Sequence, residues 1–262
     1  MTILLGLLAA FEFSAAAGPA AAMVAGGAIA DWRGAASANP ALAAACGRFN
    51  AAMSYEQPYA LAGLKHADAQ AGASFGRIAI VAAGSDLGLE SYHEYDLGLA
   101  LATSVLQSGT FGVGAHALAI RSGGDVEFAP AFDAGGCWDF GRVRVAVSGT
   151  RLNGPRLGGA GDLASTIMLS AAWRPVDELL LAGDLVRDGS NDEVRLGGEF
   201  RIIPALGLRA GLGTAPLRYA AGVAATAGPV VLDYAFHLHP VLGGSHHLGL
   251  QLSVPSSRRA RG

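Results

Sequence analysis

Four histidines lie close together near the end of the sequence, where their side chains could bind a metal ion. They are His237, His239, His246 and His247. His237 and His239 are two residues apart, so in an extended strand both rings project from the same face. Two imidazoles in that arrangement suit a transition metal. The simpler interpretation is that all four are ordinary histidines at an interface or in an enclosed interior. With that interpretation we expect no metal and no other cofactor.

Nine charged residues share one parity within segments of alternating polarity, which would place their side chains on one side of a sheet. These residues are Asp96, Arg142, Arg144, Asp184, Arg195, Glu199, Arg201, Arg209 and Asp233. Arginines and carboxylates that face an enclosed polar interior can form an ion-pair network that stiffens a protein. The alternative is a charged constriction that selects solutes by their charge. We expect the stiffening network.

Catalytic and nucleic-acid-binding features are scarce. The sequence has no phosphate-binding loop, no paired-glycine nucleotide fingerprint and no His-Glu-x-x-His motif. Cys46 and Cys137 are too few for a disulfide scaffold and lack zinc-ligand spacing. The net charge is -3, and no basic stripe is present that could neutralise phosphates. We therefore predict that the protein is not an enzyme and has no nucleic-acid partner.

From about residue 50 onward the polarity of the side chains alternates with a period of two, which is typical of strands. Turn residues divide this region into fourteen segments. The segments are 51–57, 65–74, 77–87, 90–104, 111–122, 127–138, 142–152, 161–174, 178–188, 193–203, 206–214, 217–227, 230–239 and 245–254. Strands of globular proteins are most often about five or six residues long, whereas a strand that spans a membrane needs about nine to eleven. Most of the segments have the longer length.

The composition indicates that the apolar side of these strands faces lipid. Charged residues make up 15% of the chain, against about 25% in ordinary soluble domains, and Lys65 is the only lysine. A soluble β-sandwich, the alternative, would have an outer face of glycine, alanine and arginine. In lipid no water satisfies an open sheet edge, so the strands must close. We predict an all-β fold, a transmembrane antiparallel β-barrel of about fourteen strands, with twelve as the alternative.

The N-terminus has the pattern of an export signal. An apolar run from Ile3 to Phe11 is followed by small residues, and Ala15 and Ala17 fit an A-x-A cleavage site ahead of Gly18. Residues 1–17 are therefore predicted to be a signal peptide. The alternative is an amphipathic or buried N-terminal helix.

Short motifs resemble those of the FadL-like and PorV-like outer-membrane proteins. His247, Gly249, Leu252 and Val254 fit the final strand that such barrels present to the outer-membrane assembly machinery. A Gly-Gly stretch leads to Asn39, Pro40 and Ala41, which resemble the Asn-Pro-Ala of the group's N-terminal segment. Residues 179–203 resemble a late hairpin of the group. The resemblance implies a barrel in the outer membrane of a Gram-negative cell.

The resemblance also implies how the chain is divided. Residues 18–48 would fold into the lumen as a hatch, and residues 49–254 would form the barrel. Residues 255–262 are predicted to be a disordered tail. With the hatch inside, Cys46 and Cys137 could meet as a disulfide, but we expect two separate buried thiols.

The implied function is the passage of hydrophobic small molecules, such as fatty acids, through the outer membrane. Membrane lipid and the assembly machinery are the expected partners, with a hydrophobic small molecule as ligand. One alternative is a PorV-like accessory barrel that anchors secreted proteins, and another is a purely structural barrel. Asn39, Pro40 and Ala41 are the candidate gating residues. Asn39 and Pro40 equally fit a helix start, with a cap followed by a proline at the first helical position.

Overall fold

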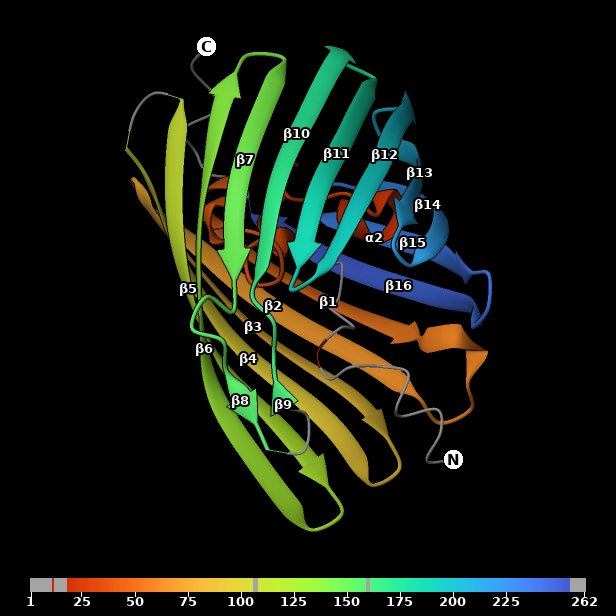
Figure 1. Ribbon diagram of the computed structural model, residues 1–262. Coiled ribbons are helices and arrows are strands. Elements are labelled where there is room, and N and C mark those ends of the chain that lie inside the picture. Colours follow the sequence, from red (N-terminus) through yellow and green to blue (C-terminus); the bar gives the residue numbers. More distant parts are fainter. Residues whose placement is uncertain (1–10, 12–17, 106–107, 159–160, 255–262) are drawn as a thin grey trace.

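A computed structural model describes residues 11, 18–105, 108–158 and 161–254, and in them fourteen antiparallel strands form a closed barrel (Figure 1). The barrel strands are β1 (Phe49–Gln57), β2 (Lys65–Phe75), β3 (Ile78–Leu89), β4 (Tyr92–Ser104), β5 (Gly109–Ser122), β6 (Asp125–Phe140), β7 (Val143–Thr150), β10 (Thr166–Val176), β11 (Leu179–Asp188), β12 (Asn191–Ile203), β13 (Leu206–Thr214), β14 (Leu217–Ala227), β15 (Val230–His239) and β16 (Gly243–Val254). The short strands β8 (Arg156–Leu157) and β9 (Gly161–Asp162) form a separate pair. The predicted all-β barrel of fourteen strands is confirmed.

The barrel closes between its first and last strands. β1 pairs antiparallel with β16 in a register that runs from Phe49 opposite Val254 to Gln57 opposite His246. Neither strand is left with an unpaired edge, which is the condition for a sheet in lipid.

Each predicted segment overlaps one barrel strand, but two boundaries differ substantially. The segment 142–152 ends at Thr150, because Arg151 has a left-handed φ of 54° that an extended strand does not allow. The segment 161–174 joins the barrel only at Thr166. Its first residues lie in the β8–β9 pair instead.

The alternation of side chains fixes which side of the barrel faces lipid. On β4, Leu97, Leu99 and Leu101 point outward and are 63%, 42% and 41% exposed. Ala100 and Ala102 point inward and are 1% and 4% exposed. Large apolar side chains therefore form the outer surface of β4, and small ones face the lumen. The helices of the described residues do not include one long and apolar enough to cross a membrane.

The two ends of the barrel have different connections. At one end, which we call the turn end, most strands are joined by short turns such as residues 76–77 and 228–229. At the other, the loop end, the connections include residues 58–64 and 151–165. The loop end points downward in Figure 1. Outer-membrane barrels have short periplasmic turns and longer extracellular loops, and the turn end corresponds to the periplasmic end of such barrels.

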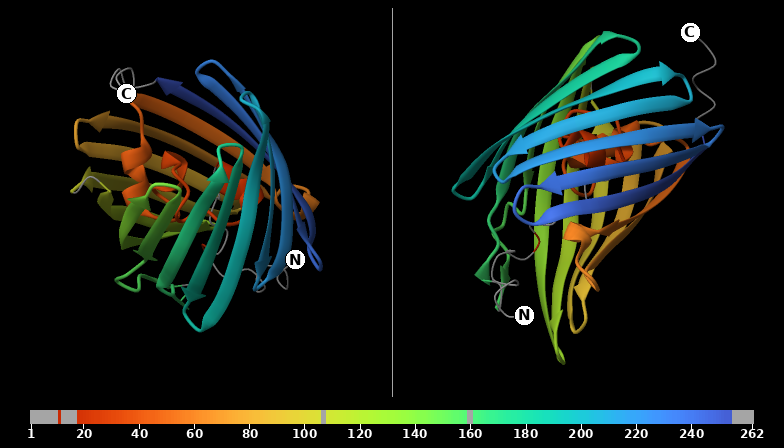
Figure 2. Two further views of the ribbon diagram at one scale, coloured as in Figure 1. Left: turned by 90° about the horizontal axis from the view of Figure 1, so that it is seen from above. Right: turned by 90° about the vertical axis from the view of Figure 1, so that its right-hand side faces the viewer.

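Residues 18–48, which we call the luminal segment, lie inside the ring of strands (Figure 2). Three short helices belong to it: α2 (Pro19–Met23), η1 (Trp32–Gly34) and η2 (Pro40–Ala45). η2 packs against β3 to β6, and α2 packs against β12 to β15. A fourth short helix, η3 (Pro58–Ala60), lies at the loop end.

Small wall residues make room for the luminal segment. Its buried side chains, among them Met23, Trp32 and Leu42, form one apolar cluster with alanines of the wall such as Ala100 and Ala146. A barrel lined with larger residues would fill its own lumen, so the alanine lining is what allows a chain segment inside.

Candidate functional site

A chain of buried ion pairs joins the luminal segment to the barrel wall. Arg33 contacts Asp31 at 2.7 Å and Asp233 of β15 at 2.6 Å. Asp233 also pairs with Arg209 of β13, which contacts Glu199 of β12 at 2.7 Å. Arg33, Asp233 and Arg209 are 4%, 4% and 9% exposed. These charges are paired within the protein, as buried charges must be.

The carboxylates keep Arg33 ionised despite its burial. Burial lowers the pKa of Arg33, but the carboxylates of Asp31 and Asp233 outweigh it and hold this pKa above its ordinary value. Arg33 is therefore a permanent positive charge that fixes the segment to β15.

A second wall carboxylate binds the main chain of the segment. Asp184 of β11 accepts hydrogen bonds from the backbone N–H groups of Gly26 and Gly27, at 2.8 Å and 3.4 Å. Ser148 of β7 donates its hydroxyl to the carbonyl of Ala38 at 2.7 Å. The segment is thus attached by polar contacts to strands on different sides of the barrel.

Asn39 and Pro40 begin η2 inside the lumen. The side-chain oxygen of Asn39 accepts from the N–H of Ala41 at 3.0 Å, and Pro40 takes the first helical position. The amide nitrogen of Asn39 donates to the carbonyl of Gly27 at 3.3 Å and to the thiol of Cys137 at 3.4 Å. The helix-start geometry is therefore present, and it occurs at a point where the segment contacts β6.

Glycines on β12 and β13 allow α2 to lie directly against the wall. A Cβ atom on Gly211 or Gly197 would lie 2.1 Å from the carbonyl oxygen of Met23. Gly207 lies four residues before Gly211 on the same face of β13. A Cβ on Gly207 would lie 3.6 Å from Glu199, which is an ordinary contact distance.

Gly211→Ala is expected to push α2 away from the wall, because overpacking at a close contact costs about 1–3 kcal/mol. Tryptic cleavage after the buried Arg33, followed by mass spectrometry, should then be about tenfold faster than in the parent protein. The control is Gly207→Ala, on the same strand and the same face, which should leave the cleavage rate unchanged. Equal rates for the two variants would contradict the packing described here.

Cys46 and Cys137 are both free and buried. Burial raises the pKa of the Cys46 thiol to about 11. The thiolate is the reactive form of cysteine, and very little of it is present at pH 7 when the pKa is raised in this way. In a Cys137→Ala background, maleimide should label Cys46 very slowly at pH 7 and faster as the pH rises toward 11. Rapid labelling of the folded protein at pH 7 would show that the thiol is not buried.

The remaining charged residues predicted to share a network divide into separate groups. Arg142 lies in a turn at the turn end, where it donates to the carbonyl of Arg174 at 3.3 Å. Arg144 pairs with Asp139 at the same end. Parity gives the side of a strand but not its depth, which is why both residues were expected in the lumen.

Two further members pair locally on β12. Arg195 contacts Glu193 at 2.8 Å, and Arg201 lies 3.9 Å from Glu199. Asp96 belongs to a different cluster and contacts His116 at 2.8 Å. Within the predicted set, ion pairs between described residues join Arg201, Glu199, Arg209 and Asp233 in one chain.

Two histidines of the last hairpin share one partner, and the other two contact different groups. His237 and His247 lie 3.4 Å and 3.6 Å from the two carboxylate oxygens of Glu56 on β1. The His239 ring accepts hydrogen bonds from the backbone N–H groups of Val241 and Leu242 in the following turn. His246 contacts the hydroxyl of Tyr234 at 2.9 Å. The described part of the chain holds no group of metal-binding side chains with suitable geometry.

The proposed assembly residues all lie on β16. Leu252 and Val254 are 42% and 41% exposed on the outer face, and His247 is 1% exposed on the inner face. Gly249 pairs with Asp233 of β15. The predicted signal peptide, apart from Phe11, and the predicted tail lie outside the described residues.

Sequence reasoning also missed one Gly-x-Ser-x-Gly match, which the structure places in a hairpin. Gly72–Gly76 fits the Gly-x-Ser-x-Gly spacing of hydrolase nucleophile elbows. Such an elbow requires a sharp turn from a strand into a helix. Ser74 lies instead within β2, paired with Ala79 of the adjacent antiparallel strand. This serine is part of a hairpin and lacks the geometry of an elbow.

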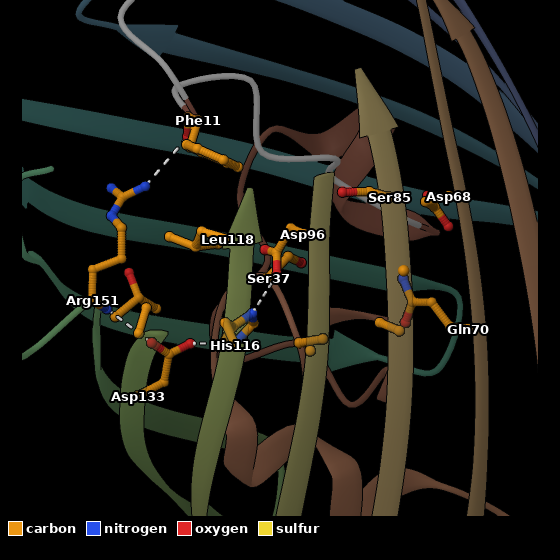
Figure 3. A pocket seen from close by; sticks show the side chains of 16 residues that line it. Phe11, Ser37, Asp68, Gln70, Ser85, Asp96, His116, Leu118, Asp133 and Arg151 are labelled. Carbon is orange, nitrogen blue, oxygen red and sulfur yellow. Dashed lines mark hydrogen bonds and ion pairs between the residues drawn. The ribbon is translucent and has the colours of Figure 1, made fainter. Parts of the chain in front are cut away.

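Two cavities lie on opposite sides of the luminal segment. The loop-end cavity, of about 100 Å³, is lined by β2 to β7 and by Ala36 and Ser37 of the segment (Figure 3). The turn-end cavity, of about 280 Å³, is lined by β10 to β16 and by segment residues from Pro19 to Arg33. The luminal segment thus separates two hollows that lie toward the two faces of the membrane.

An apolar cluster covers the loop-end cavity. Leu157 and Leu163 of the 151–165 connection pack on inward residues of β5 and β6, among them Leu118 and Ile120, and Phe11 adds its ring. The connection therefore folds inward over the barrel mouth.

Sequence reasoning missed His116, Asp133, Gln70 and Glu56. Each has inward parity and is less than 10% exposed. Parity within segments 51–57, 65–74, 111–122 and 127–138 would have identified them, but only the folded barrel brings His116 within 3.0 Å of Asp133.

A closed barrel with an apolar outer surface, small inward side chains and ion pairs in its lumen is an integral outer-membrane protein. No protein-family model and no curated protein matches the chain. Solved structures do match. The monoaromatic hydrocarbon channel CymD aligns with a TM-score of 0.72 at 11% identity, over 90% of this chain and 97% of that one.

Two other outer-membrane barrels are also similar. The TodX deltaS2S3 mutant, a monoaromatic hydrocarbon channel, has a TM-score of 0.66 at 9% identity, over 88% of this chain and 96% of that one. A FadL homologue from Pseudomonas aeruginosa has a TM-score of 0.62 at 11% identity, over 90% and 96%. The FadL-like resemblance is confirmed at the level of the fold.

Proposed function

We propose that the protein passes small hydrophobic molecules across the outer membrane, with the luminal segment as a movable hatch. The observation that carries the proposal is the position of this segment between two cavities, one toward each end of the barrel. A molecule in one cavity reaches the other only when the segment moves. The similarity in fold to channels for monoaromatic hydrocarbons supports the same function.

In this proposal a molecule enters at the loop end, past the apolar cluster around Leu118 and Leu157 that covers the cavity. It then occupies the loop-end cavity, next to Ala36 and Ser37 of the luminal segment. Displacement of the segment opens the way to the turn-end cavity and the periplasm. The displacement breaks the polar contacts and the apolar contacts between the segment and the wall, while the hydrogen bonds between the barrel strands stay in place.

The cavity size favours compact substrates. An apolar cavity of about 150 Å³ is known to bind benzene. The loop-end cavity, at about 100 Å³, suits a single ring better than the long chain of a fatty acid. We therefore propose aromatic-sized molecules as the substrate class in preference to fatty acids.

A PorV-like accessory barrel is the other function considered. Such a barrel must hold a large protein at the cell surface. Several loop-end connections, such as residues 90–91, 123–124 and 189–190, are two-residue turns and offer little surface for that purpose. The transport function is therefore preferred.

The test is uptake by whole cells of 4-nitroaniline, a yellow single-ring aromatic dye whose loss from the medium is followed by its absorbance. Cells that produce the protein should take up the dye severalfold faster than control cells that produce an unrelated closed barrel at equal abundance. Equal rates would favour a structural barrel. Co-purification of a secreted protein with equal dye rates would favour the accessory barrel.

A further inference from the structure

The loop-end cavity has more hydrogen-bond acceptors than its own side chains can satisfy. Its lining includes the carboxylates of Asp68, Asp96 and Asp133 and the amide of Gln70 (Figure 3). The basic groups of the lining are His116 and Arg151.

The two basic groups are already engaged. His116 lies between Asp96, at 2.8 Å from Nδ1, and Asp133, at 3.0 Å from Nε2. Since both ring nitrogens face carboxylates, both donate hydrogen bonds, which makes the ring an imidazolium. The guanidinium of Arg151 bonds Thr166 at 2.8 Å and reaches Asp188 at 3.5 Å, outside the cavity. The lining therefore retains an excess of negative charge.

Gln70 supplies an independent sign of a missing partner. Its side-chain oxygen is buried without a hydrogen-bond partner, and the residue is 7% exposed. A buried acceptor without a donor is costly, so such groups are rare in folded proteins. A ligand with an N–H group placed in this cavity would complete the hydrogen bonding of Gln70.

Phe11 indicates what shape of ligand the mouth of the cavity accepts. Its ring packs on the apolar cluster that includes Leu118 and Leu157. Its backbone N–H donates to Glu94 of β4 at 2.7 Å. An aromatic ring with an adjacent N–H donor thus already fits here, and Phe11 lies within the predicted signal peptide, whose removal would leave the position to a ligand.

We propose that the loop-end cavity binds a small aromatic molecule that carries a protonated amine. The ring packs against Leu118, and the ammonium group donates to Gln70, Asp68 and Asp96. This inference rests on the proposed transport function and names the substrate class more closely.

The test compares three probes with related shapes: 2-phenylethylammonium, uncharged ethylbenzene and anionic 3-phenylpropionate. Binding is measured by calorimetry on protein extracted from outer membranes, with its N-terminus identified by mass spectrometry. The ammonium should bind about tenfold more tightly than ethylbenzene, because hydrogen bonds that involve a charged group are the stronger kind. The carboxylate should bind most weakly. Equal or tighter binding of ethylbenzene would overturn the inference.

Substitutions locate the binding site. Gln70→Leu and Asp68→Asn should each weaken ammonium binding about tenfold and leave ethylbenzene binding unchanged. The control is Gln251→Leu, because Gln251 also has a buried, unpartnered side-chain oxygen but lines the turn-end cavity. It should bind all three probes normally. Unchanged ammonium binding in both loop-end variants would overturn the inference, and the wild-type comparison decides the matter if they fail to fold.

The outcomes separate this inference from the function on which it rests. Faster dye uptake together with no preference for the ammonium would leave the transport function standing and refute the amine specificity. No faster uptake together with tight ammonium binding would refute transport and keep the binding site.

Discussion

Asp233→Ala is expected to release the luminal segment from the barrel wall. The substitution removes the carboxylate shared by the buried guanidinium groups of Arg33 and Arg209. Breaking a buried ion pair by removing one partner costs about 3–5 kcal/mol. Because Asp31 and Glu199 remain as partners, we expect the lower end, about 3 kcal/mol of unfolding free energy.

The functional result of Asp233→Ala should be a more open pore. Single-channel recordings in planar bilayers should show a larger conductance and more frequent openings than in the parent protein, because the segment is no longer fixed to β15. Asp192→Ala is the matched control, because its partner Arg187 is largely exposed and surface pairs contribute about 0–1 kcal/mol. Conductance as low as in the parent would mean that the ion pairs do not hold the segment.

Leu99→Arg is expected to destabilise the barrel by about 2–4 kcal/mol, because it places a guanidinium on the lipid face near the middle of the membrane. Leu99 lies at the centre of β4 and points outward. The measurement is urea unfolding in lipid vesicles followed by tryptophan fluorescence.

The control for Leu99→Arg is the same substitution at the rim of the barrel. Leu217 is the first residue of β14 and also points outward. Near the interface an arginine costs about 0–1 kcal/mol, so Leu217→Arg should unfold at nearly the parent urea concentration. Equal losses at the two positions, or none at either, would mean that β4 does not cross lipid at this depth.

The sequence predicts the barrel well because a strand's pattern is local. Alternation with a period of two assigns each residue to a face, and turn residues such as Gly228 and Pro229 mark where strands end. It fails at residues 161–165, where polarity alone cannot distinguish a barrel strand from the short β8–β9 pair.

The site is less predictable because its contacts join distant parts of the chain. Arg33 and Asp233 are separated by 200 positions, and nothing in the sequence around either one specifies the other. His116 has inward parity, but its two carboxylate partners lie on different strands whose register must be known first. Arg142 illustrates the same limit, since its depth in the barrel depends on where the turn falls.

The most direct test of the account is to lock the luminal segment to the wall. The amide nitrogen of Asn39 lies 3.4 Å from the thiol of Cys137, so Asn39→Cys in a Cys46→Ala background would place two thiols side by side. Dye uptake is measured before and after reduction of the disulfide. Asn39→Cys combined with Cys137→Ala cannot cross-link and serves as the control. The account predicts slow uptake by the oxidised protein, fast uptake after reduction and no redox effect in the control. Equal uptake by the fully cross-linked and reduced forms would contradict it.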